Sequence, residues 1–214
     1  MIEHVYRRAF EAAGVDAVVV ATDDARIANA VEAFGGVARR TRLGHRTGTD
    51  RIAEVARDLH CDILVNVQGD LPLIEPEMIA EAIAPLVADQ SVQMSTLRRA
   101  IVDPADYDNP NVVKVVVDRN QDALYFSRSR IPYDREDSVC FKHIGLYVFR
   151  RAFLMTFAAL AQTPLERTES LEQLRALEHG YRIRTVETTF ESIEVDTQDD
   201  LERVRRQLAA VARV

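Results

Sequence analysis

The sequence has little cysteine, no surplus of positive charge and no long apolar run. No apolar stretch is long enough to cross a bilayer as a helix. The start at Met1 shows no cationic segment followed by an apolar one, as a signal peptide would. The formal net charge of -7 argues against nucleic acid or a membrane surface as the main partner. Cys61 and Cys140 have no metal-ligand spacing, so we expect no disulfide framework and a reducing, cytoplasmic location.

Several motifs of nucleotide-binding and hydrolytic enzymes are absent as well. The sequence contains no G-x-G-x-x-G, G-x-x-x-x-G-K-[ST], G-x-S-x-G or H-E-x-x-H. Their absence weakens the case for a dinucleotide-dependent oxidoreductase, a P-loop NTPase, an α/β-hydrolase or a zincin. The composition, with 47% hydrophobic and 29% charged residues among 214, is that of an ordinary folded protein.

The order of predicted elements favours one α/β domain over residues 1–214. In the first half, short apolar strands at 17–21, 37–40 and 63–67 alternate with amphipathic helices, which is typical of a parallel sheet covered on both faces. We expect these helices from Ile2 to Phe10, after Thr22-Asp23-Asp24, from Ile52 to Leu59 and from Pro76 onward.

Beyond residue 94 the pattern becomes rich in strands. We predict strands at 94–97, 112–117, 123–126 and 144–149, so that 94–150 forms a small inserted β-rich region. Helices at 150–160 and 165–178, a strand at 182–186 and a charged helix at 199–212 complete the chain.

The most informative segment runs from Ile63 to Asp70. It reads as a buried strand ending in Gly69 and one carboxylate, and ligands of open α/β sheets bind beyond the carboxyl ends of strands. Asp70 therefore suits a metal-bound nucleotide, although a plain strand followed by a polar turn fits the same residues. Asp196 follows an apolar residue and could complete a magnesium site together with Asp70. Asp199 and Asp200 instead suit the N-terminus of a helix.

Three further segments carry polar side chains that suit ligand binding. The residues around Gly48, just before a helix, could bind an anion or read a base edge. Arg128 follows a strand and suits a carboxylate or phosphate, and His143 and Tyr147 share one face of another strand. Each segment also fits a solvated loop, a capped helix or an ordinary amphipathic strand.

Taken together, these segments resemble the 3-deoxy-manno-octulosonate cytidylyltransferases, also called CMP-Kdo synthetases. Eight short motifs occur in the family order: His45-x-Thr-Gly-Thr-Asp-Arg51, Asn66-Val-Gln-Gly-Asp70, Asn109-Pro-Asn-Val-Val-Lys-Val115, Tyr125-Phe-Ser-Arg-x-x-Ile-Pro132, Lys142-His-Ile-Gly-x-Tyr147, Pro164-Leu-Glu166, Leu171-Glu-Gln-Leu-Arg175 and Val195-Asp-Thr197. Each motif is weak alone, but the ordered set is specific and covers almost the entire chain.

The resemblance implies a fold, a reaction and a set of site residues. The fold is a Rossmann-like, mostly parallel sheet of the nucleotide-diphospho-sugar transferase type, with 94–150 as a sugar-binding and dimerisation region. The anomeric hydroxyl of the sugar acid attacks the α-phosphorus of CTP, with Mg²⁺ on Asp70 and Asp196. Thr47, Gly48, Arg51, Gln68 and Asp70 would bind the nucleotide, and Gln68, Arg128, His143, Tyr147, Glu172 and Gln173 the sugar acid.

The sequence departs from the family pattern at two places. Leu71 stands where the family usually has glutamate. The family also opens with a strand and a loop of the type Pro-Ala-Arg…Arg-Leu-Pro-Gly-Lys-Pro that binds the triphosphate, and this chain begins at the following helix. We read Met1 as an internal methionine taken as the start, with a truncation or a genuinely shorter protein as alternatives.

Our leading hypothesis is therefore a magnesium-dependent cytidylyltransferase for lipopolysaccharide biosynthesis, cytoplasmic and homodimeric. We expect the chain by itself to be weak or inactive as an enzyme. The alternatives are a non-catalytic remnant that binds a sugar acid, and a cytidylyltransferase for another sugar acid.

Overall fold

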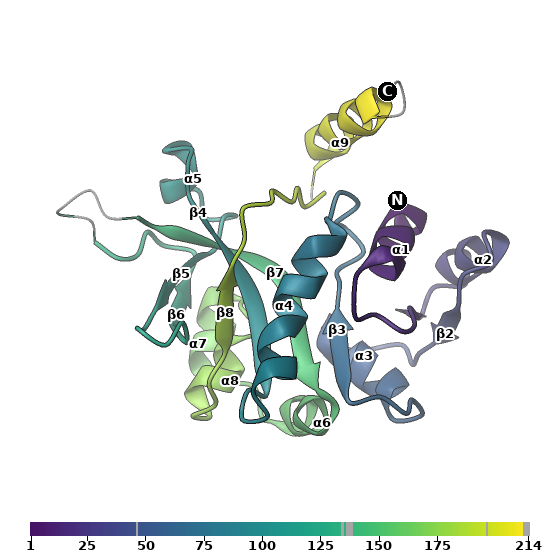
Figure 1. The fold of residues 1–214 in the computed structure, drawn as a ribbon, viewed down its shortest axis with the longest axis horizontal. Coiled ribbons are helices and arrows are strands. Elements are labelled where there is room, and N and C mark those ends of the chain that lie inside the picture. Colours follow the sequence, from purple (N-terminus) through teal and green to yellow (C-terminus); the bar gives the residue numbers. More distant parts are fainter. Residues whose placement is uncertain (46, 134, 136–138, 196, 212–214) are drawn as a thin grey trace.

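The structure is a computed structural model that describes residues 1–45, 47–133, 135, 139–195 and 197–211. Its centre is a six-stranded sheet in which the order is β6-β5-β7-β4-β8 and β3 also pairs with β7 (Figure 1). The strands of this sheet are β3 (Ile63–Asn66), β4 (Met94–Ala100), β5 (Lys114–Val117), β6 (Ala123–Ser127), β7 (Phe141–Arg150) and β8 (Arg184–Glu187). A separate parallel pair is formed by β1 (Val20–Thr22) and β2 (Ala38–Arg40).

The expected α/β class is confirmed, and the sheet is mixed because β7 runs against its neighbours. β7 is antiparallel to β3, β4 and β5, whereas β4 and β8 are parallel. β3, β4 and β8 consequently run in one direction, and their carboxyl ends face the same end of the molecule. The loops that follow these strands can therefore contribute to one site.

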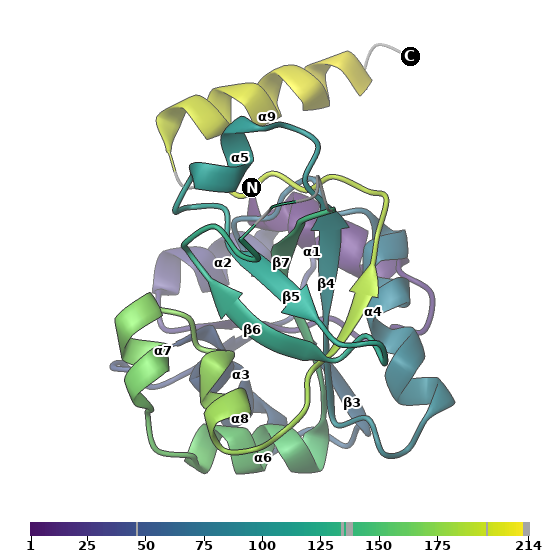
Figure 2. The same cartoon turned by 90° about the vertical axis from the view of Figure 1, so that its left-hand side faces the viewer.

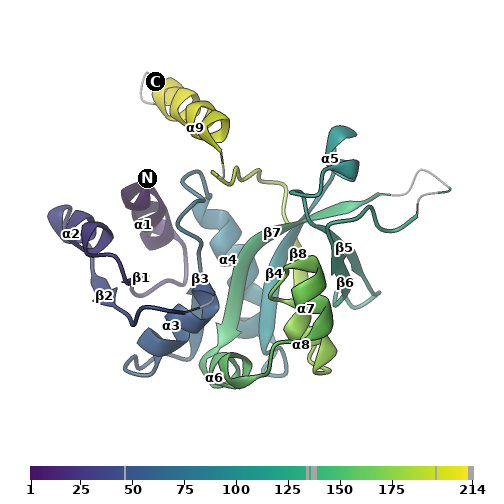
Figure 3. The ribbon, with the colours of Figure 1, turned by 180° about the vertical axis from the view of Figure 1, so that it is seen from behind.

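Helices cover both faces of the sheet. α4 (Pro76–Ala88) crosses one face, as Figure 1 shows, and α6 (Arg151–Ala159), α7 (Pro164–Glu169) and α8 (Leu174–Glu178) cover the other, as Figure 3 shows. α1 (Ile2–Glu11), α2 (Ala25–Ala33) and α3 (Gly48–Ala56) lie on the side of the β1–β2 pair. The short α5 (Ala105–Asp108) and the C-terminal α9 (Gln198–Val211) both lie at the same end of the molecule in Figure 2, but Figure 1 shows that they are apart from each other.

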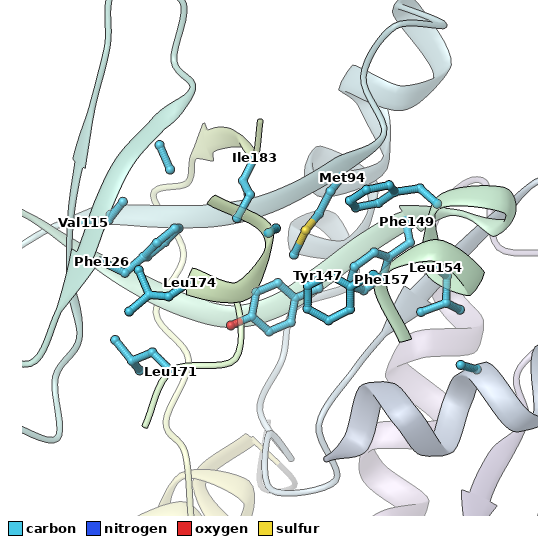
Figure 4. Packing of buried hydrophobic residues seen from close by; sticks show 14 of the residues in the cluster. Met94, Val115, Phe126, Tyr147, Phe149, Leu154, Phe157, Leu171, Leu174 and Ile183 are labelled. Carbon is cyan, nitrogen blue, oxygen red and sulfur yellow. The ribbon is translucent and has the colours of Figure 1, made fainter. Parts of the chain in front are cut away.

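β7 separates two apolar clusters because its side chains alternate between the faces of the sheet. Leu146 and Val148 pack with Met78 and Ile79 of α4 on one side. On the other side Phe149 packs with aromatic and aliphatic residues of β4, α6 and α8, and Figure 4 shows this second cluster. Removal of apolar area from water on both faces stabilises β7 in the sheet.

Local sequence explains most helix boundaries. Asp24 accepts a hydrogen bond from the Arg26 amide and caps α2, and Pro76 occupies the first turn of α4, both as predicted. The predicted continuous helix over 165–178 is wrong. Ser170 adopts a left-handed conformation with φ of 52°, which ends α7 and lets α8 start in a new direction.

Neither Cys61 nor Cys140 takes part in a disulfide. Within the part of the chain that the structure describes, every helix is too short or too polar to traverse a lipid bilayer.

Replacing Phe149 by alanine should cost about 3–5 kcal/mol of unfolding free energy, because the ring is 1% exposed and its loss leaves a cavity. The matched control is Phe10→Ala on α1, where the ring is 59% exposed and the cost should stay near about 0.5 kcal/mol. Urea unfolding of both variants measures the difference. Equal losses would show that the centre of the sheet is not packed as described.

Candidate active site

The turn that precedes α3 lies against the loop that follows β3. Thr47 caps α3, since its hydroxyl accepts a hydrogen bond from the Asp50 amide at 3.1 Å. A Cβ added to Gly48 would stand 3.3 Å from Oε1 of Gln68, so glycine allows the close approach of these segments. The structure thus brings together three of the residues expected to bind the nucleotide: Thr47, Gly48 and Gln68.

Glu172 joins this turn to the segment between α7 and α8. Its carboxylate accepts hydrogen bonds from the hydroxyls of Thr47 and Thr49, each at 2.8 Å. Asn66 at the end of β3 donates to the Thr49 hydroxyl at 3.3 Å. Burial raises the pKa of the Glu172 carboxyl, and the two threonine hydrogen bonds oppose that rise. A residue predicted to contact the sugar acid therefore also positions the turn predicted to read the base.

Three of the residues expected on the sugar-acid side contact one another: His143 and Tyr147 on β7, and Gln173 at the start of α8. The Tyr147 hydroxyl donates to Oε1 of Gln173 at 3.0 Å. The rings of His143 and Tyr147 lie with centroids 5.4 Å apart, which confirms that they share a face of the strand. Burial raises the pKa of Tyr147 well above its usual value, so this phenol stays protonated.

Thr96 of β4, which the sequence did not single out, fixes the imidazole of His143. Its hydroxyl donates to the carbonyl of Leu146 at 2.7 Å and lies 2.8 Å from Nε2 of His143. Because the hydroxyl proton is used by the carbonyl, Nε2–H of His143 is the donor and Nδ1 carries the lone pair. Burial lowers the pKa of His143 to about 3, so the ring is neutral at physiological pH. The only sequence signal for Thr96 is the pair of polar residues Ser95 and Thr96 between the apolar Met94 and Leu97 of a predicted strand.

Arg128 lies just beyond β6, and backbone carbonyls hold its side chain. The guanidinium donates to the carbonyls of Glu169 at 2.8 Å, Pro110 at 2.9 Å and Ser170 at 3.4 Å. These bonds engage three of the five N–H groups of a guanidinium. The Arg128 side chain is thereby anchored to the segment that continues into Leu171 and Glu172.

Arg51 is placed differently from the other residues expected to bind the nucleotide. It lies on α3, and its guanidinium donates to the hydroxyl of Thr41 at 2.7 Å and pairs with the carboxylate of Asp23 at 3.2 Å. These contacts tie α3 to the ends of β1 and β2. The geometry thus gives Arg51 a position at the edge of the turn rather than a contact with Glu172.

The two expected magnesium ligands belong to segments that meet. The Val195 amide donates to the carbonyl oxygen of Asp70 at 2.9 Å, which joins the loop after β3 to the segment before α9. Asp196 itself lies outside the described residues. Among the described residues no three His, Cys, Asp or Glu side chains are grouped to hold a metal. A single hard carboxylate such as Asp70 nevertheless suits Mg²⁺, which is usually bound by one or two carboxylates together with substrate phosphates.

The fold and the clustered polar loops define a nucleotidyltransferase-type α/β protein. Residues 1–193 match the cytidylyltransferase family. More narrowly, the chain belongs to the 3-deoxy-manno-octulosonate cytidylyltransferases. It is 56% identical to the protein of that name from Geobacter metallireducens, over 98% of this chain and 87% of the relative, and 53% identical to that of Solibacter usitatus, over 98% and 84%.

Solved structures agree with this assignment. A CMP:2-keto-3-deoxy-manno-octonic acid synthetase complexed with CTP matches with a TM-score of 0.93 and 45% identity, covering 98% of this chain and 87% of that one. A 4-diphosphocytidyl-2C-methyl-D-erythritol synthase from Anaerococcus prevotii matches with a TM-score of 0.63 at 14% identity, over 97% of this chain and 88% of that chain, which shows the shared fold alone.

The lowered pKa of His143 predicts a pH-dependent stability. Between pH 6.5 and about 3 the unfolded chain binds a proton at this histidine that the folded chain does not, so the free energy of unfolding falls as the pH falls. At pH 5 the loss relative to pH 7 should reach about 2 kcal/mol. Urea unfolding at several pH values should show that His143→Gln removes this part of the slope. The exposed His60→Gln is the control and should keep it; an unchanged slope in the His143 variant would contradict the burial argument.

Proposed function

We propose that this protein transfers CMP from CTP to the anomeric hydroxyl of 3-deoxy-manno-octulosonate and releases pyrophosphate, as a step of lipopolysaccharide biosynthesis. The observation that carries the proposal is the Glu172 carboxylate, which bonds the Thr47–Thr49 turn and adjoins Gln173. Glu172 thereby joins the turn expected to bind the base to a segment expected to contact the sugar acid. The names of the relatives supply the identity of the two substrates.

The reaction forms a bond between the anomeric oxygen and the α-phosphorus and breaks the bond from that phosphorus to pyrophosphate, while the hydroxyl proton leaves. Such a displacement needs alignment and charge neutralisation more than a protein nucleophile. Because Gly48 has no side chain, the edge of a base can approach the start of α3. The planar guanidinium of Arg128 can donate two parallel hydrogen bonds to the sugar carboxylate. His143 Nδ1 accepts a hydrogen bond from a sugar hydroxyl.

We further propose Mg²⁺ as the cofactor, held by Asp70 and Asp196 together with phosphate oxygens. When bound, this ion neutralises charge on the phosphates and lowers the pKa of the attacking hydroxyl. The carboxylate of Asp70 and the Val195–Asp70 backbone hydrogen bond support that assignment.

A homodimer in the cytoplasm also belongs to the proposal. The inserted region carries large apolar side chains in solvent, with Val102 80%, Tyr133 86% and Val139 64% exposed. The Ile101 amide donates to the Cys140 carbonyl at 2.9 Å, which brings the neighbourhoods of Val102 and Val139 together. Grouped exposed apolar side chains of this kind mark protein interfaces, and this supports 94–150 as a dimerisation region.

Release of pyrophosphate from CTP, Mg²⁺ and 3-deoxy-manno-octulosonate tests the proposed function. The chain should be assayed alone and in an extended form, in which the triphosphate-binding segment typical of the family is added at the N-terminus. We expect turnover from the extended form with this sugar acid and little with sialic acid. Calorimetric binding of the sugar acid together with no turnover in either form would instead support a non-catalytic binding protein.

Asp70→Asn should reduce turnover about a hundredfold or more without reducing the free energy of unfolding, because the neutral amide is a poor ligand for Mg²⁺. Asp58→Asn, which changes an exposed carboxylate beyond α3, is the control and should leave turnover unchanged. The extended form serves for both assays. Full activity in the Asp70 variant would exclude a role in binding the metal.

Glu172→Gln should raise the KM for CTP about tenfold, because Thr47 and Thr49 donate to different carboxylate oxygens and the amide replaces one of these acceptors by an NH2 donor. Glu178→Gln on α8 is the matched control, since that carboxylate bonds the Leu165 amide instead. A double-mutant cycle with Thr49→Val sharpens the test: the two losses should be far from additive. Additive losses would show that Glu172 acts without positioning the turn.

A further inference from the structure

Lys114 on β5 is a fully buried cation in a chain that uses almost no lysine. Lys114 and Lys142 are the only lysines among 27 residues of Lys and Arg. Lys114 is 0% exposed, whereas Lys142, its partner across the β5–β7 pairing, forms ion pairs with Asp106 and Glu191. Burying an ammonium is costly unless hydrogen bonds satisfy it.

Three backbone carbonyls satisfy the Lys114 ammonium. Its Nζ donates to the carbonyl oxygens of Asn109 at 2.9 Å, Val112 at 2.7 Å and Arg128 at 2.6 Å. An ammonium has three N–H groups, and these three carbonyls use all of them. Lys114 consequently has no donor left for a ligand and cannot itself bind substrate.

The same carbonyls belong to the two segments that place the Arg128 side chain. One is the main chain of Arg128 itself, and the other is the loop 109–112, where Pro110 accepts a hydrogen bond from Nη1 of Arg128 at 2.9 Å. Lys114 thus holds the main chain from which the Arg128 side chain extends. It also holds the loop that contains Pro110, whose carbonyl accepts a hydrogen bond from that side chain. A compact ammonium can point three donors from a single atom, which the planar fork of an arginine cannot do.

We propose that Lys114 is a positioning residue that holds the Arg128 guanidinium in place to receive the carboxylate of the sugar acid. The inference rests on the proposed function in assigning that carboxylate to Arg128. The positioning itself concerns only contacts within this chain, so it can be tested whether or not the substrate is correct.

The charges around Lys114 agree with this role. Burial lowers the pKa of the Lys114 amine, the positive charge of Arg128 acts in the same direction, and Asp106, Asp108 and Glu169 oppose it. Of the two neighbouring cations, only Arg128 has further donors, so an anionic group would bind at Arg128 and not at Lys114.

The test compares Lys114→Met with Lys142→Met, the same substitution on the neighbouring strand. Nitrogen-15 NMR of the assigned Arg128 Nε–H, which donates to the Glu169 carbonyl, reports whether the side chain stays in place without any ligand. Calorimetric titration with 3-deoxy-manno-octulosonate gives the dissociation constant. Lys114→Gln, which keeps two donors on a shorter side chain, serves as the second variant if the Met variant does not fold.

We expect Lys114→Met to accelerate hydrogen exchange at Arg128 Nε–H at least tenfold and to weaken sugar-acid binding about tenfold, with Lys142→Met near wild type in both. Unchanged exchange in folded Lys114→Met or Lys114→Gln would overturn the proposal. Accelerated exchange with unchanged sugar-acid binding would also overturn it, leaving a purely structural residue. If the unmutated chain binds no sugar acid, the proposed substrate fails, and the exchange measurement alone decides whether Lys114 positions Arg128.

Discussion

The arrangement of the site depends on β7, which runs antiparallel to all three strands that it pairs with. It pairs with β3, β4 and β5 and packs apolar clusters on both faces, so its residues have little freedom to shift. A change of register by one residue would send every side chain to the opposite face. His143 and Tyr147 therefore hold fixed positions at the end of the sheet where the loops after β3 and β8 converge.

The partly buried carboxylate of Glu172 then connects the two halves of the site. Glu172 comes from the segment between α7 and α8, and it bonds threonines more than a hundred residues earlier in the chain. A carboxylate withdrawn from water is unfavourable unless hydrogen bonds compensate it. Glu172 consequently stabilises the Thr47–Thr49 turn against the sugar-acid side, which in the proposed function would couple the recognition of the two substrates.

Local signals in the sequence predicted much of this structure. Asp24 before α2, Pro76 at the start of α4 and the strand from Ile63 each combine a capping residue, a proline or an apolar run with a clear boundary. The family motifs also led to His143 and Tyr147, which the structure places on one face. These features depend on residues that are close together in the sequence, so the sequence alone is enough to predict them.

The remaining features arise from contacts between distant segments. The direction of β7 depends on three partners, and the break between α7 and α8 requires a left-handed Ser170 that no local pattern announces. The bond between Thr96 and His143 and the three carbonyls around Lys114 exist only after the sheet has formed. The bonds from the Arg51 guanidinium to Thr41 and Asp23 likewise form only once α3 packs beside β1 and β2.

A crystal structure of the protein with CTP, Mg²⁺ and a sugar-acid analogue that lacks the attacking hydroxyl tests this account most directly. We predict that the cytosine lies against the Thr47–Gly48 turn, that the carboxylate of the sugar acid binds Arg128, and that Glu172 lies between the two ligands. A carboxylate bound away from Arg128, with Glu172 contacting neither ligand nor turn, would contradict it.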